Sequence, residues 1–254
     1  MTGVSLKIGT SLTSGLGRVA NRNGLLIMLS YMIVGLVWQV LFYSAVVAQI
    51  QSAGVDASAI GLPSIDAPFA VLAVGALLLL LVLQYLTIIA IRTFVGGYSS
   101  TIPSEAYTRN IGLTLVNSIL AGISFGVLVM VGSVFLFIPG IIAYVAFIFG
   151  LFYVAAEDEN FIAGLRNSWS LTRGNWLRLF VLLMIAIGTI ALVSGILSFV
   201  ASLVVSVVGG QAAATLASGV ISLPFSVLTL GVLAEAFNQL QGGEAAKQGT
   251  PTMS

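Results

Sequence analysis

The sequence has 254 residues, of which 59% are apolar and only 7% are charged, with a mean hydropathy of +1.13. A soluble domain carries about a quarter charged residues, so this composition predicts a polytopic membrane protein. The net charge is +1 and the chain has neither cysteine nor histidine, which excludes disulfides, thiolate catalysis, histidine metal sites and serine–histidine triads, and gives no sign of nucleic-acid binding.

Long apolar runs predict the membrane-spanning helices. A helix needs about 20 residues, at a rise of about 1.5 Å each, to cross a hydrocarbon core about 30 Å thick. We expect spans at residues 24–48, 69–91, 110–136, 138–156, 176–207 and 212–237. The first run is longer than the apolar core of a signal peptide, so we expect it to be retained. The predicted fold is an all-α membrane helix bundle of about six transmembrane helices with short cytoplasmic interfacial helices.

Two breaks divide the longest apolar stretches. Residues 110–156 carry no charge, and one helix of this length would measure about 70 Å, more than twice the hydrocarbon core. We therefore place a turn at the FIPG motif, where Pro139 interrupts helical hydrogen bonding and Gly140 allows the chain to turn. The pair Gly209 and Gly210 separates the last two predicted spans in the same way.

The distribution of basic residues predicts the orientation. In a six-span topology all nine lysines and arginines fall on one side, whereas the loops on the other side carry only Asp56 and Asp66. Under the positive-inside rule both termini are then cytoplasmic, in a multi-pass protein of the cell membrane. We divide the chain into a cytoplasmic N-terminal segment (1–23), a six-helix transmembrane domain (24–237) and a flexible cytoplasmic tail (238–254).

Similar sequences precede the first, third and fifth predicted spans. They read VANRNGLLIML, AYTRNIGLTLV and SLTRGNWLRLF, and each places an arginine with asparagine or glycine before an apolar run. One interpretation is that every cytoplasmic helix entry selects cations and small polar residues. The other is that the chain consists of three repeated helix hairpins, each opened by an interfacial segment.

The most charged stretch is EDENFIAGLRNSWSLTRGNW, residues 157–176, which predicts an amphipathic interfacial helix over residues 159–173. One face gathers small or apolar residues at helical spacing: Phe161, Leu165, Ser168, Trp169 and Thr172. We expect Glu157, Asp158 and Glu159 to cap the start of this helix. A metal site is not expected here, because three consecutive helical residues point to different sides.

Few polar residues lie within the predicted spans. Arg92 and Glu235 stand near cytoplasmic helix ends, where we expect them to snorkel or to form structural pairs. Serines recur every fourth residue in the last two spans, which predicts a close antiparallel hairpin that touches near Ser202 and Ser218.

Two stretches resemble a known family. They are RTFVGGYSSTIPSEAYTRNIGLTLVNSILAGI (92–123) and FIPGIIAYVAFIFGLFYVAAEDENFIAGLRNSWSLTRGNWLRLF (137–180). Their Pro-Gly, ED-N-F and SW-LT-GN--RLF elements are similar to an uncharacterised, haloarchaeal-type family of six-span integral membrane proteins. They are more distantly similar to the membrane domain of some glycerophosphodiester phosphodiesterases. The resemblance implies an archaeal membrane protein and a six-span fold, and no catalytic residue of the phosphodiesterase domain can be carried over.

Two functions fit this sequence. The first is a non-enzymatic membrane protein that organises lipid or binds a partner, with membrane lipids, a protein partner or a second copy as its ligands and no nucleic acid. The alternative is a transporter or permease for a small or lipid-like molecule. The spans show no ionisable residue near their centre, which favours the first function. We predict no catalytic, cofactor-binding or metal-binding residue, and hence no enzyme.

Overall fold

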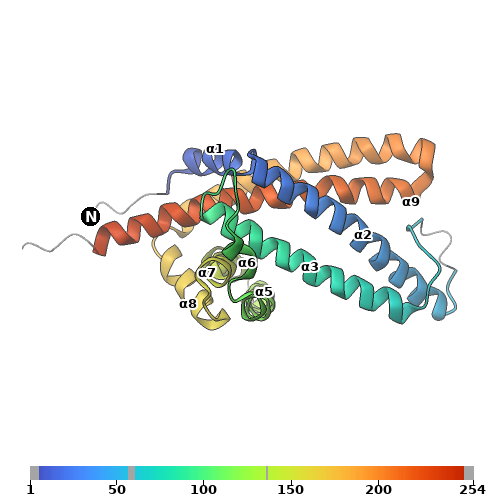
Figure 1. Cartoon of the computed structure of the whole chain (residues 1–254), viewed down its shortest axis with the longest axis horizontal. Coiled ribbons are helices and arrows are strands. Elements are labelled where there is room, and N and C mark those ends of the chain that lie inside the picture. Colours follow the sequence, from blue (N-terminus) through green and yellow to red (C-terminus); the bar gives the residue numbers. More distant parts are fainter. Residues whose placement is uncertain (1–5, 57–60, 136, 249–254) are drawn as a thin grey trace, which may run out of the picture. The chain divides into compact units, whose positions relative to one another are not determined.

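The computed structural model describes residues 6–56, 61–135 and 137–248, which form helices and no strands (Figure 1). The helices in this part of the chain are α1 Ile8–Val19, α2 Arg22–Ser52, α3 Phe69–Val95, α4 Ser104–Thr108, α5 Ile111–Phe135, α6 Phe137–Phe147, α7 Gly150–Glu157, α8 Phe161–Thr172 and α9 Trp176–Gln248. The predicted all-α class is confirmed.

Five helical segments are long and apolar enough to cross a membrane. They are Arg22–Ser52, Phe69–Val95, Ile111–Val134, Ile138–Glu157 and Trp176–Gly242. The last is much longer than a bilayer requires, and its backbone leaves the helical region at Gly210, where φ is 73° and ψ is −178°. Figure 1 shows that α9 reverses direction and forms two arms. The predicted break at this glycine pair is confirmed.

The chain forms two compact units that differ in charge. We call Met1–Leu25, Thr87–Gly188 and Leu228–Ser254 the charged unit, because it contains every lysine and arginine of the sequence. We call Leu26–Leu86 and Thr189–Val227 the apolar unit, whose only formally charged residues are Asp56 and Asp66. The charge segregation expected from the sequence is therefore also a division between structural units.

An aromatic cluster forms part of the core of the charged unit. Phe149, Phe152, Tyr153 and Phe237 are buried, and their ring centroids lie 5.0 to 5.6 Å apart in the contacting pairs. The cluster fixes α7 against the C-terminal arm of α9. Beyond the predicted end of the last span at residue 237, α9 continues to Gln248.

A break between α6 and α7 is stabilised by α8. The Ser168 hydroxyl of α8 accepts a hydrogen bond from the Phe149 N–H at 3.1 Å and donates to the Ala146 carbonyl at 2.8 Å. These are backbone groups that the interrupted helix leaves without an intrahelical partner. Ser168 and Thr172 were expected on the inner face of this helix and are buried there. Gly164 and Leu171, which the predicted face omitted, are buried with them, whereas Trp169, which the predicted face included, is exposed.

A short helix precedes three of the long ones, since α1, α4 and α8 lead into α2, α5 and α9. An asparagine stands directly before each long helix, at Asn21, Asn110 and Asn175. In each case the asparagine carbonyl accepts a hydrogen bond, of 2.9 or 3.0 Å, from the N–H four residues later. This shared arrangement favours the interpretation of three repeated units, each opened by a short helix.

In the apolar unit the two arms of α9 contact each other. The Ser198 hydroxyl donates to the Ser218 carbonyl of the other arm at 3.2 Å, which confirms the predicted hairpin. This contact is one turn away from the predicted pair, because the Ser202 hydroxyl donates to the Phe199 carbonyl of its own arm. Serine spacing indicates which helix faces meet, but it does not fix the register between them.

Candidate functional site

Two arginine-centred clusters lie in the charged unit. The first surrounds Arg92 of α3, whose side chain is only 4% exposed. Its Nη2 lies 2.8 Å from Asp158 Oδ1, and Arg109 Nε lies 2.5 Å from Asp158 Oδ2. The Thr114 hydroxyl also donates to Asp158, at 3.1 Å. One carboxylate therefore pairs with two guanidinium groups, and the expectation that Arg92 forms a structural pair is confirmed.

Arg92 also binds backbone carbonyls at helix ends. Its Nε donates to the Ala155 carbonyl at 2.7 Å, Nη1 to Ala106 at 3.1 Å and Nη2 to Arg109 at 2.9 Å. These carbonyls belong to the C-terminal turns of α7 and α4, where the helix dipole favours a cation. The planar guanidinium can serve several carbonyls at once, which a lysine ammonium could not do in this geometry. The cluster thus joins α3, α4 and α7.

The expectation that Glu157, Asp158 and Glu159 cap α8 is wrong. The cap is Asn160, whose Oδ1 accepts the Ala163 N–H at 2.9 Å. Asp158 instead ends α7 in the left-handed conformation, with φ at 57°, and is committed to its arginines. Asparagine and aspartate adopt this conformation more readily than most residues, which is the one signal in the sequence that could have placed the end of α7 here.

The other two acids have separate roles. The Glu159 carboxylate accepts two hydrogen bonds from Asn167, at 2.7 and 2.9 Å, and Glu157 accepts one from Gln241. Burial raises the pKa of Glu159 above its usual value; the Asn167 hydrogen bond opposes this shift, and repulsion from Glu157 adds to it. The three acids therefore do not converge on one point as catalytic carboxylates would.

The second cluster surrounds Arg18, which lies in the last turn of α1. Its Nη2 lies 2.6 Å from Glu235 Oε2, and its Nη1 donates to the Phe94 carbonyl. The Asn238 and Asn23 side chains donate to the Val95 and Tyr98 carbonyls, each at 2.9 Å. The end of α3 is therefore capped by side chains from three other segments. The predicted structural pairing of Glu235 is confirmed, with Arg18 as its partner.

Two polar pockets adjoin these clusters. One of about 500 Å³ lies beside the Arg18–Glu235 pair and is also lined by Ser14, Asn21 and Thr93. The Thr93 side chain is fully buried, and its hydroxyl has no hydrogen-bond partner among the described residues. A smaller pocket of about 140 Å³ lies beside Arg92 and Arg109. Both are lined by hydrogen-bonding groups and are suited to small polar ligands.

Exposed cations lie on α8, at its C-cap and in the first turn of α9. Arg166, Arg173 and Arg178 are exposed, and the structure records no ion pair for them in the ranges it describes. Arg166 and Arg173 share a helical stripe with Ile162, which is 65% exposed, and Trp169, which is 39% exposed. The Trp169 ring lies edge-on to Trp176, with centroids 5.0 Å apart. A stripe of cations, an aliphatic side chain and indoles is suited to the boundary between headgroups and acyl chains.

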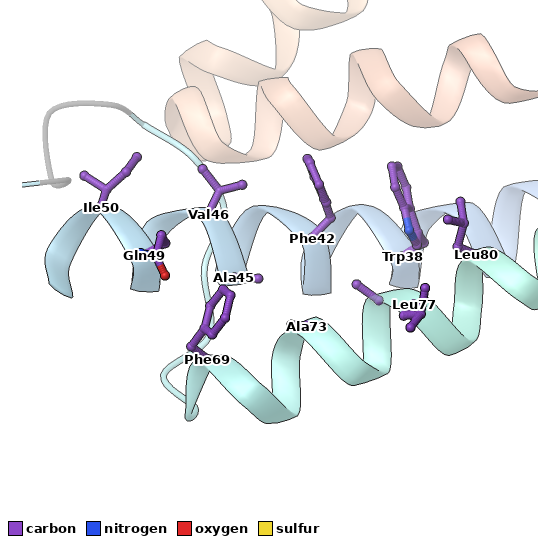
Figure 2. Close-up of a pocket in the computed structure, with 11 residues that line it drawn as sticks. Trp38, Phe42, Ala45, Val46, Gln49, Ile50, Phe69, Ala73, Leu77 and Leu80 are labelled. Carbon is purple, nitrogen blue, oxygen red and sulfur yellow. The ribbon is translucent and has the colours of Figure 1, made fainter. Parts of the chain in front are cut away.

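The apolar unit contains a groove of about 490 Å³ between α2 and α3. Figure 2 shows Gln49, Ile50 and Phe69 at one end and Trp38 and Leu80 at the other. Apolar side chains make up almost all of its surface. Sequence reasoning missed this groove, because its shape depends on how two uniformly apolar helices are rotated toward each other.

Comparison with known proteins identifies a family. A family model described as a domain of unknown function (DUF7847) matches residues 6–240. No curated protein and no solved structure matches the chain. The haloarchaeal origin and the similarity to the phosphodiesterase membrane domain stay predictions, as does the absence of catalytic, cofactor-binding and metal-binding residues.

Proposed function

The chain belongs to the DUF7847 family, and we propose that it is a six-span, non-enzymatic membrane protein that organises anionic lipid. The observation that carries this proposal is the set of exposed arginines on α8, at its C-cap and in the first turn of α9, beside the exposed indole of Trp169 and the half-buried indole of Trp176. The charged residues that are buried in the charged unit pair with each other at helix ends, which is a structural role. Arg166, Arg173 and Arg178 are instead exposed, next to the indoles of Trp169 and Trp176, which are typical of the headgroup region.

Six spans follow if each arm of α9 crosses the membrane once. Each arm on either side of Gly210 is longer than the about 20 residues that a span needs. With six spans the basic side is the cytoplasmic side, and both termini lie there. The apolar unit contains no lysine or arginine. In this topology the loop after α2, which belongs to the apolar unit, lies on the outer side.

Cysteine labelling tests this topology. The chain has no cysteine, so Ser64→Cys and Ser100→Cys each introduce a single thiol at an exposed loop position. We expect an impermeant maleimide to label Ser64→Cys on intact cells, and Ser100→Cys only after permeabilisation. The reverse pattern would overturn the orientation, and labelling of both positions on intact cells would overturn the span count.

The strength of lipid binding follows from the number of free cations. Each basic side chain near an anionic surface contributes about 1 kcal/mol, and the contribution falls with ionic strength. Three arginines on one surface can therefore enrich anionic lipid around α8 by about tenfold or more. The indoles of Trp169 and Trp176 hold this surface at the depth where phosphates are found. No bond is made or broken in this function.

Neutralising the three arginines tests the proposal. We expect the triple variant Arg166→Gln, Arg173→Gln, Arg178→Gln to lose about tenfold of the preference for phosphatidylglycerol over phosphatidylcholine. The preference can be measured from the lipids retained by the protein after extraction from mixed vesicles. The triple Arg→Lys variant keeps the charge and serves as the matched control. Unchanged selectivity in the glutamine variant would contradict the proposed function.

The alternative, a transporter for a small or lipid-like molecule, is favoured by one observation. The pocket of about 500 Å³ beside Arg18 and Glu235 is lined in part by Thr93, whose buried hydroxyl has no partner among the described residues. A buried hydroxyl without a partner is costly unless a ligand or water satisfies it. Saturable uptake of a solute into vesicles containing the protein would support transport over lipid organisation.

A further inference from the structure

The groove of the apolar unit has the shape of a site for one lipid chain. We propose that it binds a single alkyl chain of an outer-leaflet lipid, with the polar end of that lipid at Gln49. The inference deepens the proposed function and uses its topology, in which the loop after α2 is outside. It concerns a different unit and a different part of the lipid from the arginines of α8.

The length of the groove matches one leaflet. From Trp38 to Gln49, α2 rises about 16 Å, which is about half of a hydrocarbon core of about 30 Å. Gln49 lies three residues before the end of α2, next to the outer loop, and Trp38 lies toward the centre of the span. A chain that enters at Gln49 would therefore reach the bilayer centre within the groove.

The residues that line the groove differ in size and burial. Ala45 and Ala76 are buried, whereas Phe42 and Phe69 are half-exposed. The Trp38 ring stacks on Phe42, with centroids 5.1 Å apart and planes 14° apart, which gives a flat wall. Small residues between larger ones leave room for a row of methylene groups.

Close packing beside the groove shows that its helices meet. A Cβ atom on Gly75 would lie 2.9 Å from Leu41 Cδ1, so the Leu41 side chain fills the space over this glycine. The two helices are thus in contact beside the groove. The concave surface is a consequence of side-chain size and not of a separation between the helices.

An alkyl chain suits this surface better than a protein segment does. A helix is about 10–12 Å wide with its side chains, so it would cover the groove without filling it. In a bilayer the hydrophobic effect does not favour the chain, because lipid tails are as apolar as leucine; binding depends on van der Waals packing against a fixed surface. The Gln49 amide at the outer end can donate to an ester carbonyl near the headgroup.

Photo-crosslinking tests this site. The full-length protein is placed in vesicles of phosphatidylcholine and phosphatidylglycerol with a trace of phosphatidylcholine that carries a diazirine in its acyl chain. We expect adducts to concentrate on groove residues of α2 and α3. Ala73→Phe fills the groove and should lower the adduct yield about tenfold, a loss that corresponds to about 1.4 kcal/mol. Val74→Phe, at the next residue and outside the groove, should leave the yield unchanged.

Several outcomes would overturn the proposal. These are equal yields in Ala73→Phe and Val74→Phe, adducts spread evenly around both helices, and adducts that form elsewhere on the protein but not in the groove, which would identify a second copy as the occupant. If Ala73→Phe does not fold, the smaller change Ala73→Leu decides between the same outcomes. The arginine variants of α8 should not alter this crosslink, so failure of the site and failure of the proposed function can be told apart.

Discussion

Replacing Asp158 by asparagine should destabilise the charged unit by about 3 kcal/mol, the lower end of the range for removing one partner of a buried ion pair. The buried Arg92 guanidinium would lose the carboxylate 2.8 Å from it, and Arg109 would lose its partner at the same time. The lower end applies because the Asp158 side chain is 18% exposed. Asparagine tolerates the left-handed backbone at this residue, so the loss reports on charge and not on strain. Denaturant or thermal unfolding in detergent measures the effect.

Glu159→Gln is the matched control. The neighbouring carboxylate accepts hydrogen bonds from Asn167 and has no ion pair in the part of the chain that the structure describes, and a glutamine oxygen can keep one of these hydrogen bonds. We expect a change below about 1 kcal/mol at neutral pH. The raised pKa of Glu159 means that the folded state binds its proton more tightly, so stability falls as pH rises from the unfolded pKa to the raised folded value. The glutamine variant should lose this dependence. Equal destabilisation by both substitutions would contradict the role assigned to Asp158.

The long helices could be predicted because their length is set by the membrane. The span predicted at residues 69–91 corresponds to α3 at Phe69–Val95, and the one predicted at 24–48 to α2 at Arg22–Ser52. The extra residues are interfacial turns that the hydropathy pattern does not delimit. The break at Gly210 could also be predicted, since it divides a helix too long for one crossing. The turn predicted at Pro139 and Gly140 is wrong in position, because both residues lie in the first turn of α6, where a helix tolerates proline.

The site residues could not be predicted because they depend on contacts between distant segments. Arg92 and Asp158 are 66 residues apart in the chain, and nothing near either one indicates the other. Three acidic residues at 157–159 fit the start of a following helix as well as the end of a preceding one. Only the left-handed backbone at Asp158 shows that this segment ends α7. The groove between α2 and α3 is likewise a property of two helices and not of either sequence. Local patterns therefore indicated where the long helices lie. The partners of the charged side chains could be identified only from the fold.

Gly15→Ala should destabilise the charged unit by about 1–3 kcal/mol, the usual cost of overpacking. A Cβ atom at Gly15 would lie 2.5 Å from the Cα of Val232 and 3.0 Å from the Gly231 carbonyl oxygen. These are backbone atoms of α9, which cannot rotate away as a flexible side chain would. The substitution therefore has to push α1 away from the arm of α9 that it packs on, and the Arg18–Glu235 pair joins the same two helices.

Gly17→Ala, two residues further along α1, should have the opposite sign. No atom lies within 4 Å of a Cβ built at Gly17, and alanine is favoured over glycine within a helix by about 0.5–1 kcal/mol. We expect a small rise in the unfolding temperature for Gly17→Ala and a fall for Gly15→Ala. Because helix propensity favours alanine equally at both positions, the difference between the two variants measures the α1–α9 contact alone. A rise in both variants would show that α1 does not pack on α9 through Gly15.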